Sequence, residues 1–422
     1  MNIARTYGDL VRKNMETHPD RAAWLIRKGL HLEAFRCKHL ADKRMPQAYR
    51  YLNYQGIHLV AEALDHPENY AWTNIFAPVE LLQSFGLTCV CMECLSSYLS
   101  GFYLEDALID YAESEGLAST MCSYHKSFIG AVDAGLIPRA SCAVTTSMIC
   151  DGNVQTFRHL EERHAVPAFV LDIPHTYSAE AEAYVVDQLT ELIAFLEKKT
   201  GRAFDMEELQ RTLERENESK AHFLSFLQKR MTRRYPNTLT LVVFQLFATH
   251  LDIGMPWVLD FFRQLDQEID RYPLSDEKRL LWLHLEPFDQ KTLRSYLNYG
   301  DKVTLAYDDF DLDYTEPLDA AHPLQSLARK MILNIYNGDF RRKVEAIEGF
   351  VNTYRPDGVV QFCHWGCRQS SGGVMLLKDK MKELDVPMLV LDGDAIDRRN
   401  CPDGQIRTRF EAFLEVLRKD GE

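Results

Sequence analysis

Short apolar runs alternate with segments of helical periodicity in two separate blocks of this chain. The alternation is typical of α/β folds, in which each apolar run is a buried strand and each periodic segment is the helix that leads to the next parallel strand. The chain has 422 residues, which is more than one hydrophobic core usually holds. The clearest runs lie at residues 168–173, 280–285, 303–307, 358–362 and 388–391. We therefore predict an α/β protein with two parallel-sheet units.

The stretches outside these blocks are helical in character. Residues 1–70 are charged and helix-prone, and residues 203–275 contain no convincing strand pattern. Ser178 and Gly201 mark the two ends of one predicted helix between these stretches. The predicted parts are an N-terminal helical segment (1–70), a first α/β domain (71–202), a helical segment (203–275) and a second α/β domain (276–422).

Charge and hydropathy argue against two classes of partner. The formal net charge is −14, whereas a protein that binds duplex nucleic acid needs a basic face. The longest apolar run, residues 239–251, is interrupted by Gln245 and His250 and is too short to span a bilayer. The first residues lack the apolar core of a signal sequence. We expect no nucleic-acid or membrane partner, and a cytoplasmic location.

Three of the ten cysteines are expected where a strand ends and a helix begins. Cys150 follows the apolar run 143–149, Cys367 follows the run 358–362, and Cys122 precedes a periodic stretch although its strand is weakly marked. Open α/β sheets place their chemistry at this edge, because strand ends converge there and helix N-termini present N–H groups. If the two units face each other, the three thiols can meet in the cleft between them.

Three thiolates suit an iron–sulfur cluster with one iron left open, or a zinc ion with an open position. The wide sequence separation of these cysteines matches no local metal motif, and a buried, unmodified thiol is the common state of cysteine. The residues alone therefore leave the metal site and simple packing as alternatives. Two other sets of cysteines are interpreted as core packing, with metal contact as the alternative. One is the C-x-C-x₂-C pattern of Cys89, Cys91 and Cys94, and the other is Cys363, which lies close to Cys367.

Five short motifs carry a family resemblance. They are Cys122-Ser123-Tyr124-His125-Lys126, Ile149-Cys150-Asp151-Gly152, His364-Trp365-Gly366-Cys367-Arg368-Gln369, Asp392-Gly393-Asp394 and the segment 404–413. Together they resemble the 2-hydroxyacyl-CoA dehydratase and benzoyl-CoA reductase family, in particular a subunit of the iron–sulfur dehydratase component. The resemblance covers residues 70–200 and 300–420, in the family's order. The His-Trp-Gly-Cys stretch is its most specific element.

The resemblance implies that Cys122, Cys150 and Cys367 are the ligands of a [4Fe–4S] cluster held between two flavodoxin-like units. It also implies a lyase subunit that removes water from a 2-hydroxyacyl-CoA through a ketyl radical, after one-electron reduction by an ATP-hydrolysing iron–sulfur activator. A homologous second subunit, or a second copy of this chain, completes the implied assembly. Some branches carry a further cysteine where this chain has Asn74 and Ile75, so a single cluster is expected.

Two histidines adjoin the proposed ligands. His364 and His125 are interpreted as catalytic proton donors, with a structural hydrogen bond at a strand end as the alternative. Glu80 matches a family position and is equally explained by helix capping. Three other functions remain open: a reductase of the benzoyl-CoA or small-molecule type, a cluster-carrying electron relay or assembly partner without acyl-CoA chemistry, and a zinc hydrolase.

Overall fold

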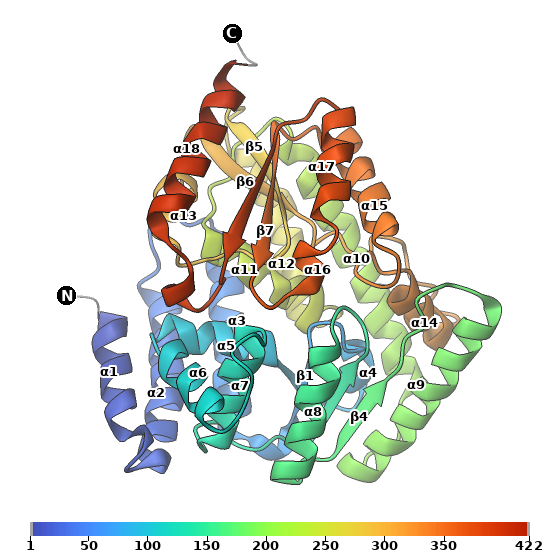
Figure 1. Ribbon diagram of the computed structural model, residues 1–422. Helices are drawn as coiled ribbons and strands as arrows, with labels where there is room; N and C mark the ends of the chain where they lie inside the picture. The colour runs from blue at the N-terminus through green and yellow to red at the C-terminus, as the bar shows by residue number, and fades with distance from the viewer. Residues whose placement is uncertain (1–2, 420–422) are drawn as a thin grey trace.

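The computed structural model describes residues 3–419, which form two α/β units lying one above the other (Figure 1). Three helices precede the first unit and pack along its side. Their apolar faces are buried, for example Leu52 and Ile57, because these side chains recur at helical spacing. The helices are α1 (Ile3–Met15), α2 (Pro19–His39) and α3 (Gln47–Asp65).

The first unit contains a four-stranded, all-parallel sheet in the order β2-β1-β3-β4. Its strands are β1 (Tyr70–Thr73), β2 (Thr88–Cys91), β3 (Cys142–Thr146) and β4 (Ala168–Leu171). Its helices are α4 (Val79–Ser84), α5 (Met92–Gly101), α6 (Glu105–Ser114), α7 (Ser123–Asp133), α8 (Asp151–His164) and α9 (Ala179–Thr200). The Ser178 hydroxyl caps α9 by accepting from the N–H of Ala181, and Gly201 ends it with a φ of 67°, as predicted.

The second unit contains another four-stranded parallel sheet, in the order β6-β5-β7-β8. Its strands are β5 (Lys278–Leu283), β6 (Val303–Asp308), β7 (Gly358–His364) and β8 (Met388–Gly393). Its helices are α13 (Lys291–Leu297), α14 (Pro323–Leu333), α15 (Phe340–Tyr354), α16 (Arg368–Ser371), α17 (Val374–Glu383) and α18 (Asp403–Lys419).

Both sheets follow one topology. If the strands are counted within each unit, the order is 2-1-3-4 in both, which is the start of a flavodoxin-like sheet. Each first strand carries a fully buried tryptophan, Trp72 in β1 and Trp282 in β5. Both faces of such sheets are covered by helices, which is why the strands read as apolar runs. The predicted α/β class with two parallel-sheet units is confirmed.

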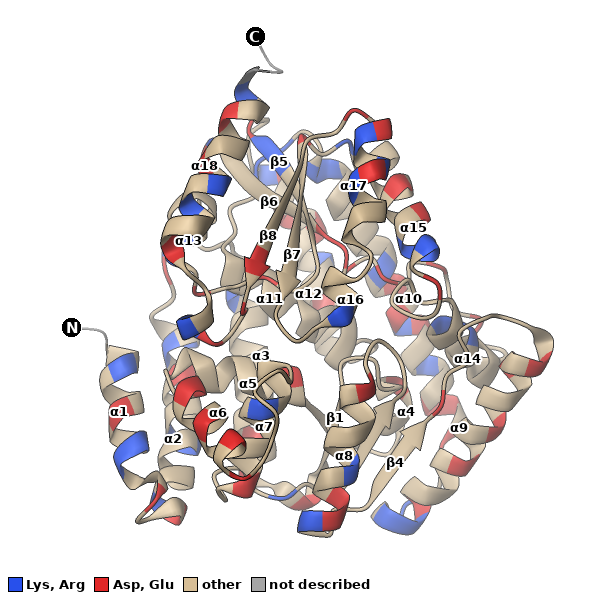
Figure 2. Ribbon diagram, in the orientation of Figure 1, with Lys and Arg blue, Asp and Glu red and all other residues tan. Residues whose placement is uncertain are grey.

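Three helices of the middle segment join the two units: α10 (Met206–Arg230), α11 (Leu239–Leu246) and α12 (Pro256–Glu268). The apolar run 239–251 forms α11 and the short π-helix Phe247–Leu251, and the Phe247 ring packs close against Gly56 of α3. Among residues 3–419, no helix combines the length and the apolar character that a membrane crossing requires. Lys and Arg are interspersed with Asp and Glu over outer helices such as α15 and α17 (Figure 2).

One local prediction is wrong, and two strands were not predicted. Cys122 does not follow a strand: it comes after α6 and an irregular segment, and only the helix after it is present. The sequence pattern also does not single out β1 and β2, because strands of four residues offer too few positions to establish a period. β2 coincides with the start of the Cys89, Cys91 and Cys94 pattern.

Candidate functional site

Cys150 and Cys367 occupy equivalent places in the two units. Each follows the third strand of its sheet and precedes the next helix as its N-cap residue. The residue before each cysteine has a left-handed backbone, with φ of 63° at Ile149 and 80° at Gly366. A left-handed turn at a strand end redirects the chain sharply. In both units this turn places the thiol at the carboxyl edge of the sheet, beside the point where the strand order reverses.

Cys122 completes the group from the N-terminus of α7. The segment around it touches the second unit closely, because a Cβ atom at Gly366 would lie 2.8 Å from the backbone nitrogen of Cys122. The third thiol therefore reaches the interface between the units through a tight backbone contact rather than through a strand end.

The structure brings Cys122, Cys150 and Cys367 together around two adjoining cavities at this interface. We call the first one the inner cavity; its walls are mostly apolar and include Ile75, Leu246, Leu285 and Phe310. We call the second one the outer cavity; it has a volume of about 390 Å³ and more polar walls, including Asp151, His175, Asn337 and Arg368. All three thiols, and also His125 and Gly366, line both cavities.

Burial makes thiolates costly at this site unless positive charge is added. Burial raises the pKa of Cys122 well above its usual value, and the nearby Cys367 raises it further. The pKa of Cys150 is also raised by burial, although the N–H of Gly152 donates to its sulfur at 3.2 Å and opposes the rise. A bound metal removes this penalty because it stabilises thiolate over thiol.

Each of the three sulfurs has a histidine beside it. The distances from sulfur to Nε2 are 3.2 Å for Cys122 and His364, 3.9 Å for Cys150 and His125, and 3.5 Å for Cys367 and His284. The N–H of Ala395 donates to Nδ1 of His364 at 3.1 Å, so the proton of that ring is on Nε2 and points at the Cys122 sulfur.

These imidazoles are neutral. Burial is the main cause that lowers the pKa of His125 to about 4, and it lowers the pKa of His284 and His364 as well. A neutral imidazole can donate its one N–H to a sulfur without adding charge. Sequence reasoning missed His284, which directly follows β5, the first strand of its sheet. Its position at the strand-order reversal is the signal that points to it.

A second missed residue is Glu93, near the start of α5, which lines the inner cavity. Burial raises the pKa of its carboxyl group to about 7. The Cys91 thiol donates to its Oε2 at 2.7 Å. A glutamate within the otherwise apolar run of Cys89, Cys91 and Cys94 is the sequence signal that was available.

The remaining cysteines of interest are buried. Cys89 and Cys91 lie in β2, whereas Cys94 lies in α5 and also lines the inner cavity. The Cys363 thiol contacts the carbonyl oxygen of Ser370 at 3.5 Å within the second unit. Glu80 is buried, and its carboxyl group is paired with Lys330 at 2.5 Å; this ion pair, not a capping hydrogen bond at the start of α4, is the contact that the structure shows.

The three thiols can be compared with the ligands that a metal ion and an iron–sulfur cluster require. Within residues 3–419, no group of three or more His, Cys, Asp or Glu side chains is arranged to hold one metal ion. Each thiolate of a four-iron cluster binds a different iron, so thiolates around a cluster stand farther apart than the ligands of one ion. Three thiols that border one open cavity are the type of donor that an iron–sulfur cluster takes.

Comparison with known proteins gives the family. The model of the 2-hydroxyglutaryl-CoA dehydratase D-component matches residues 74–417. The (R)-phenyllactyl-CoA dehydratase alpha subunit of Clostridium sporogenes is 22% identical, over 90% of this chain and 98% of the relative. The lactoyl-CoA dehydratase subunit alpha of Anaerotignum propionicum is 21% identical, over 84% and 92%. A benzoyl-CoA reductase subunit of Thauera aromatica is 20% identical, over 72% and 78%.

The family match and the fold agree along the chain. The matched residues 74–417 include both sheets except β1, together with the three cysteines that border the inner and outer cavities. The chain belongs to the 2-hydroxyglutaryl-CoA dehydratase D-component family, a family of dehydratases, which are lyases.

Proposed function

We propose that this chain is a subunit of an iron–sulfur 2-hydroxyacyl-CoA dehydratase and holds one [4Fe–4S] cluster through Cys122, Cys150 and Cys367. The observation that carries the proposal is the placement of these thiols: three helix N-termini, from two facing units, present them to one cavity. Membership in a dehydratase family supports the reaction class. This chain has Asn74 and Ile75 where some branches of the family carry a further cysteine, which agrees with a single cluster rather than a larger bridged one.

The proposed cluster would supply the electron transfer that amino-acid side chains cannot provide. When bound, it would provide the single electron that converts the substrate thioester into a ketyl radical anion, and recover that electron after water has left. The chain's own residues bind and orient the substrate, exclude water and carry protons. The apolar walls of the inner cavity suit this task because they keep bulk water away from a radical.

Proton transfer is assigned to Glu93. Its carboxyl group lines the inner cavity, and its pKa of about 7 lets it both accept and release a proton at neutral pH. It would give its proton to the leaving hydroxide and then take the proton from carbon 3, which restores its protonated form. His125 also borders both cavities, with its Nε2 3.9 Å from Cys150, and remains a candidate donor to substrate oxygen.

His364 has a different role in this proposal. Its Nδ1 accepts from Ala395, and its Nε2 proton points at the Cys122 sulfur. Both ring nitrogens are therefore occupied, which favours hydrogen bonding to the ligand sulfur over proton transfer to substrate. His284, beside Cys367, would act in the same way. Such contacts tune a cluster by stabilising negative charge on its sulfurs.

The proposal includes partners. The relatives are named as subunits, two of them as alpha subunits, so a homologous second subunit, or a second copy of this chain, is the expected assembly. A separate ATP-hydrolysing iron–sulfur activator would supply the first electron. We propose a cytoplasmic location, where such reductants are available.

Oxygen-free purification with iron and sulfide counting tests the ligand set. The wild-type chain should hold about four iron and four sulfide per protomer, and Cys150→Ala should lose most of both. Cys401→Ala is the matched control, since that thiol lies outside both cavities. A full cluster in Cys150→Ala contradicts the ligand set.

A reductase is the second candidate, favoured by the similarity to the benzoyl-CoA reductase of Thauera aromatica. Product analysis separates the two reactions. A dehydratase releases water and returns the electron, so product forms without matching consumption of reductant. A reductase consumes reductant in proportion to product. An electron relay would show no change in the cluster spectrum with any CoA thioester.

A further inference from the structure

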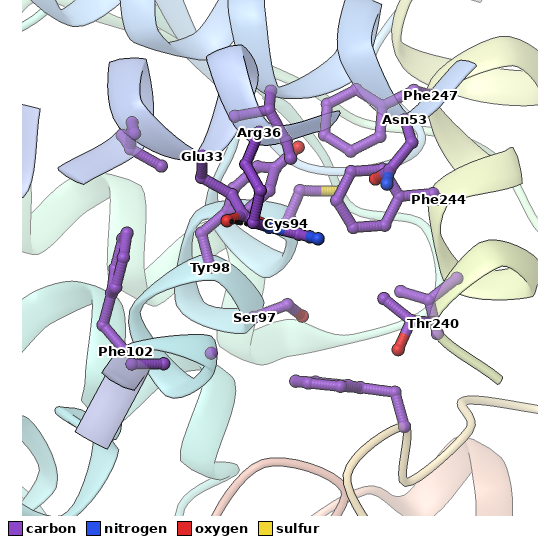
Figure 3. A pocket seen from close by; sticks show the side chains of 16 residues that line it. Glu33, Arg36, Asn53, Cys94, Ser97, Tyr98, Phe102, Thr240, Phe244 and Phe247 are labelled. Carbon is purple, nitrogen blue, oxygen red and sulfur yellow. Dashed lines mark hydrogen bonds and ion pairs between the residues drawn. The ribbon is translucent and has the colours of Figure 1, made fainter. Parts of the chain in front are cut away.

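A second apolar cavity lies beside the inner cavity and has a volume of about 210 Å³. We call it the aromatic cavity because its walls carry five aromatic rings, which are those of Tyr98, Phe102, Phe244, Phe247 and Phe288. The Tyr98 ring packs against Phe244 and Phe247, with ring centroids 5.5 Å and 5.8 Å apart. Figure 3 shows these side chains around the open space, with α5 and α11 contributing opposite walls.

The aromatic cavity continues the space in front of the three thiols. Cys94 and Ser97 of α5 and Val243 of α11 line both the aromatic cavity and the inner cavity. The hydroxyl of Ser97 donates to the carbonyl oxygen of Glu93, which fixes this part of the shared wall. A molecule whose reacting atoms lie in the inner cavity can therefore extend directly into the aromatic cavity.

The charges at the aromatic cavity neutralise each other. Arg36 and Glu33 line it and form a paired contact, with Nε of Arg36 2.7 Å from Oε2 of Glu33 (Figure 3). The arginine side chain is half exposed, so the pair lies at the rim. Among the described lining residues no other side chain carries a charge. The interior offers nothing to balance a carboxylate.

One polar group in the wall has no partner. The Tyr98 hydroxyl oxygen is buried and makes no hydrogen bond within residues 3–419. A buried hydroxyl without a partner costs free energy, which a ligand oxygen within reach would recover. Burial also raises the pKa of Tyr98 well above its usual value, so the group stays a neutral donor.

We propose that the aromatic cavity binds the acyl side chain of the substrate thioester, and that this side chain is uncharged and about the size of an aromatic ring. The inference rests on the proposed function. Size supports it, because an apolar cavity of about 150 Å³ is enough to bind benzene. The neutral interior disfavours acyl groups that end in a second carboxylate.

Binding of unreactive thioesters tests the proposal. Propionyl-CoA and 3-phenylpropionyl-CoA lack the 2-hydroxyl group, so neither can lose water. Titration calorimetry of the cluster-loaded protein should show at least about tenfold tighter binding of the phenyl thioester. Glutaryl-CoA should bind no better than propionyl-CoA. Equal affinity for the phenyl and methyl compounds, or a preference for glutaryl-CoA, overturns the proposal.

A substitution that fills the aromatic cavity provides the second test. Thr240→Trp adds an indole from α11 into the aromatic cavity and should remove the preference for the phenyl thioester while propionyl-CoA still binds. Thr190→Trp, on the exposed side of α9, is the matched control and should keep the preference. An equal loss for both thioesters in Thr240→Trp would mean that the CoA arm occupies this cavity, which overturns the assignment.

The two proposals fail in different ways. If the wild-type protein binds propionyl-CoA and its phenyl analogue equally, the dehydratase function stands and the acyl assignment falls. If no CoA thioester binds or perturbs the cluster spectrum, the proposed function fails, and the acyl assignment fails with it.

Discussion

The Nε2 atom of His364 lies 3.2 Å from the sulfur of Cys122, although the two residues belong to different α/β units. The contact is directional, because the N–H of Ala395 occupies the other ring nitrogen. Ser123, next to Cys122, also donates to the carboxylate of Asp394, beside Ala395. The position of this thiol therefore depends on how the two units are joined.

Loss of the His364 donor should make the proposed cluster harder to reduce. In His364→Leu the hydrogen bond to the Cys122 sulfur disappears, so the reduction potential should fall, and activity should drop by about 10–100-fold. Anaerobic spectroelectrochemistry gives the potential. His364→Gln keeps an N–H donor and should recover part of the difference. A potential that is the same in wild type and His364→Leu contradicts the hydrogen-bonding role.

Glu93 should control both activity and the pH dependence of stability. Its pKa is about 7 in the fold, against 4.5 for an ordinary glutamate, so between these values the folded chain keeps a proton that the unfolded chain releases. Its contribution to the free energy of unfolding therefore falls as pH rises from 4.5 to 7, by up to roughly 3 kcal/mol. Glu93→Gln should remove this slope and lower kcat by about 10²–10⁴-fold.

Urea unfolding of the metal-free protein at pH 5 and pH 8 measures this effect. The comparison uses the difference between Glu93→Gln and wild type at each pH, because Asp252 and Glu286 also have pKa values raised by burial to about 7. Glu180→Gln, at the exposed start of α9, is the control and should show no such difference. A Glu93→Gln difference that is equal at both pH values contradicts the proposed titration.

The sheet units could be predicted because each of their longer strands is a distinct apolar run followed by a helical period. The five clearest runs all form strands, with ends shifted by at most two residues, as for 280–285 against Lys278–Leu283. The run 143–149 also forms a strand, but β3 already ends at Thr146. Cys150 and Cys367 could be located for the same reason, since both stand where such a run stops. The two ends of α9 could also be predicted. They depend only on a hydrogen bond accepted by the Ser178 hydroxyl and on the left-handed backbone of Gly201.

The rest of the site depends on contacts between distant segments. Cys122 reaches the interface through an irregular segment, which no periodicity describes. The role of Glu93 depends on burial by the surrounding helices, and that of His284 on the distance to Cys367, 83 positions away in the chain. The local sequence pattern therefore identified Cys150 and Cys367 together with the strands that precede them. The roles proposed for Glu93 and His284 depend on tertiary packing, which no local pattern describes.

Lys330 should be essential for stability, because it stands between two buried carboxylates. Its Nζ lies 2.5 Å from Glu80 and 2.8 Å from Glu216, which join α14 to α4 and α10. Lys330→Met leaves these carboxylates facing each other with Lys220 alone to balance them, so the free energy of unfolding should fall by about 3–5 kcal/mol. Denaturant unfolding measures the loss.

The matched control for this substitution is Lys378→Met on the exposed face of α17, which should change stability by less than about 0.5 kcal/mol. If Lys330→Met is as mild as the control, the buried ion pairs do not hold the units together, and the shared hydrophobic core must do so instead.

Gly366 should tolerate no side chain, for two separate reasons. Its φ of 80° lies in the left-handed region, and a Cβ there would stand 2.8 Å from the backbone nitrogen of Cys122. Left-handed strain alone costs about 1–2 kcal/mol for alanine, and the contact would also push Cys122 away from Cys367. Gly366→Ala should therefore lower both the free energy of unfolding and the iron content. Gly404→Ala, where a Cβ meets nothing within 4 Å, should change neither. A fully iron-loaded Gly366→Ala protein would mean that the contact between the units can relax without moving the thiols.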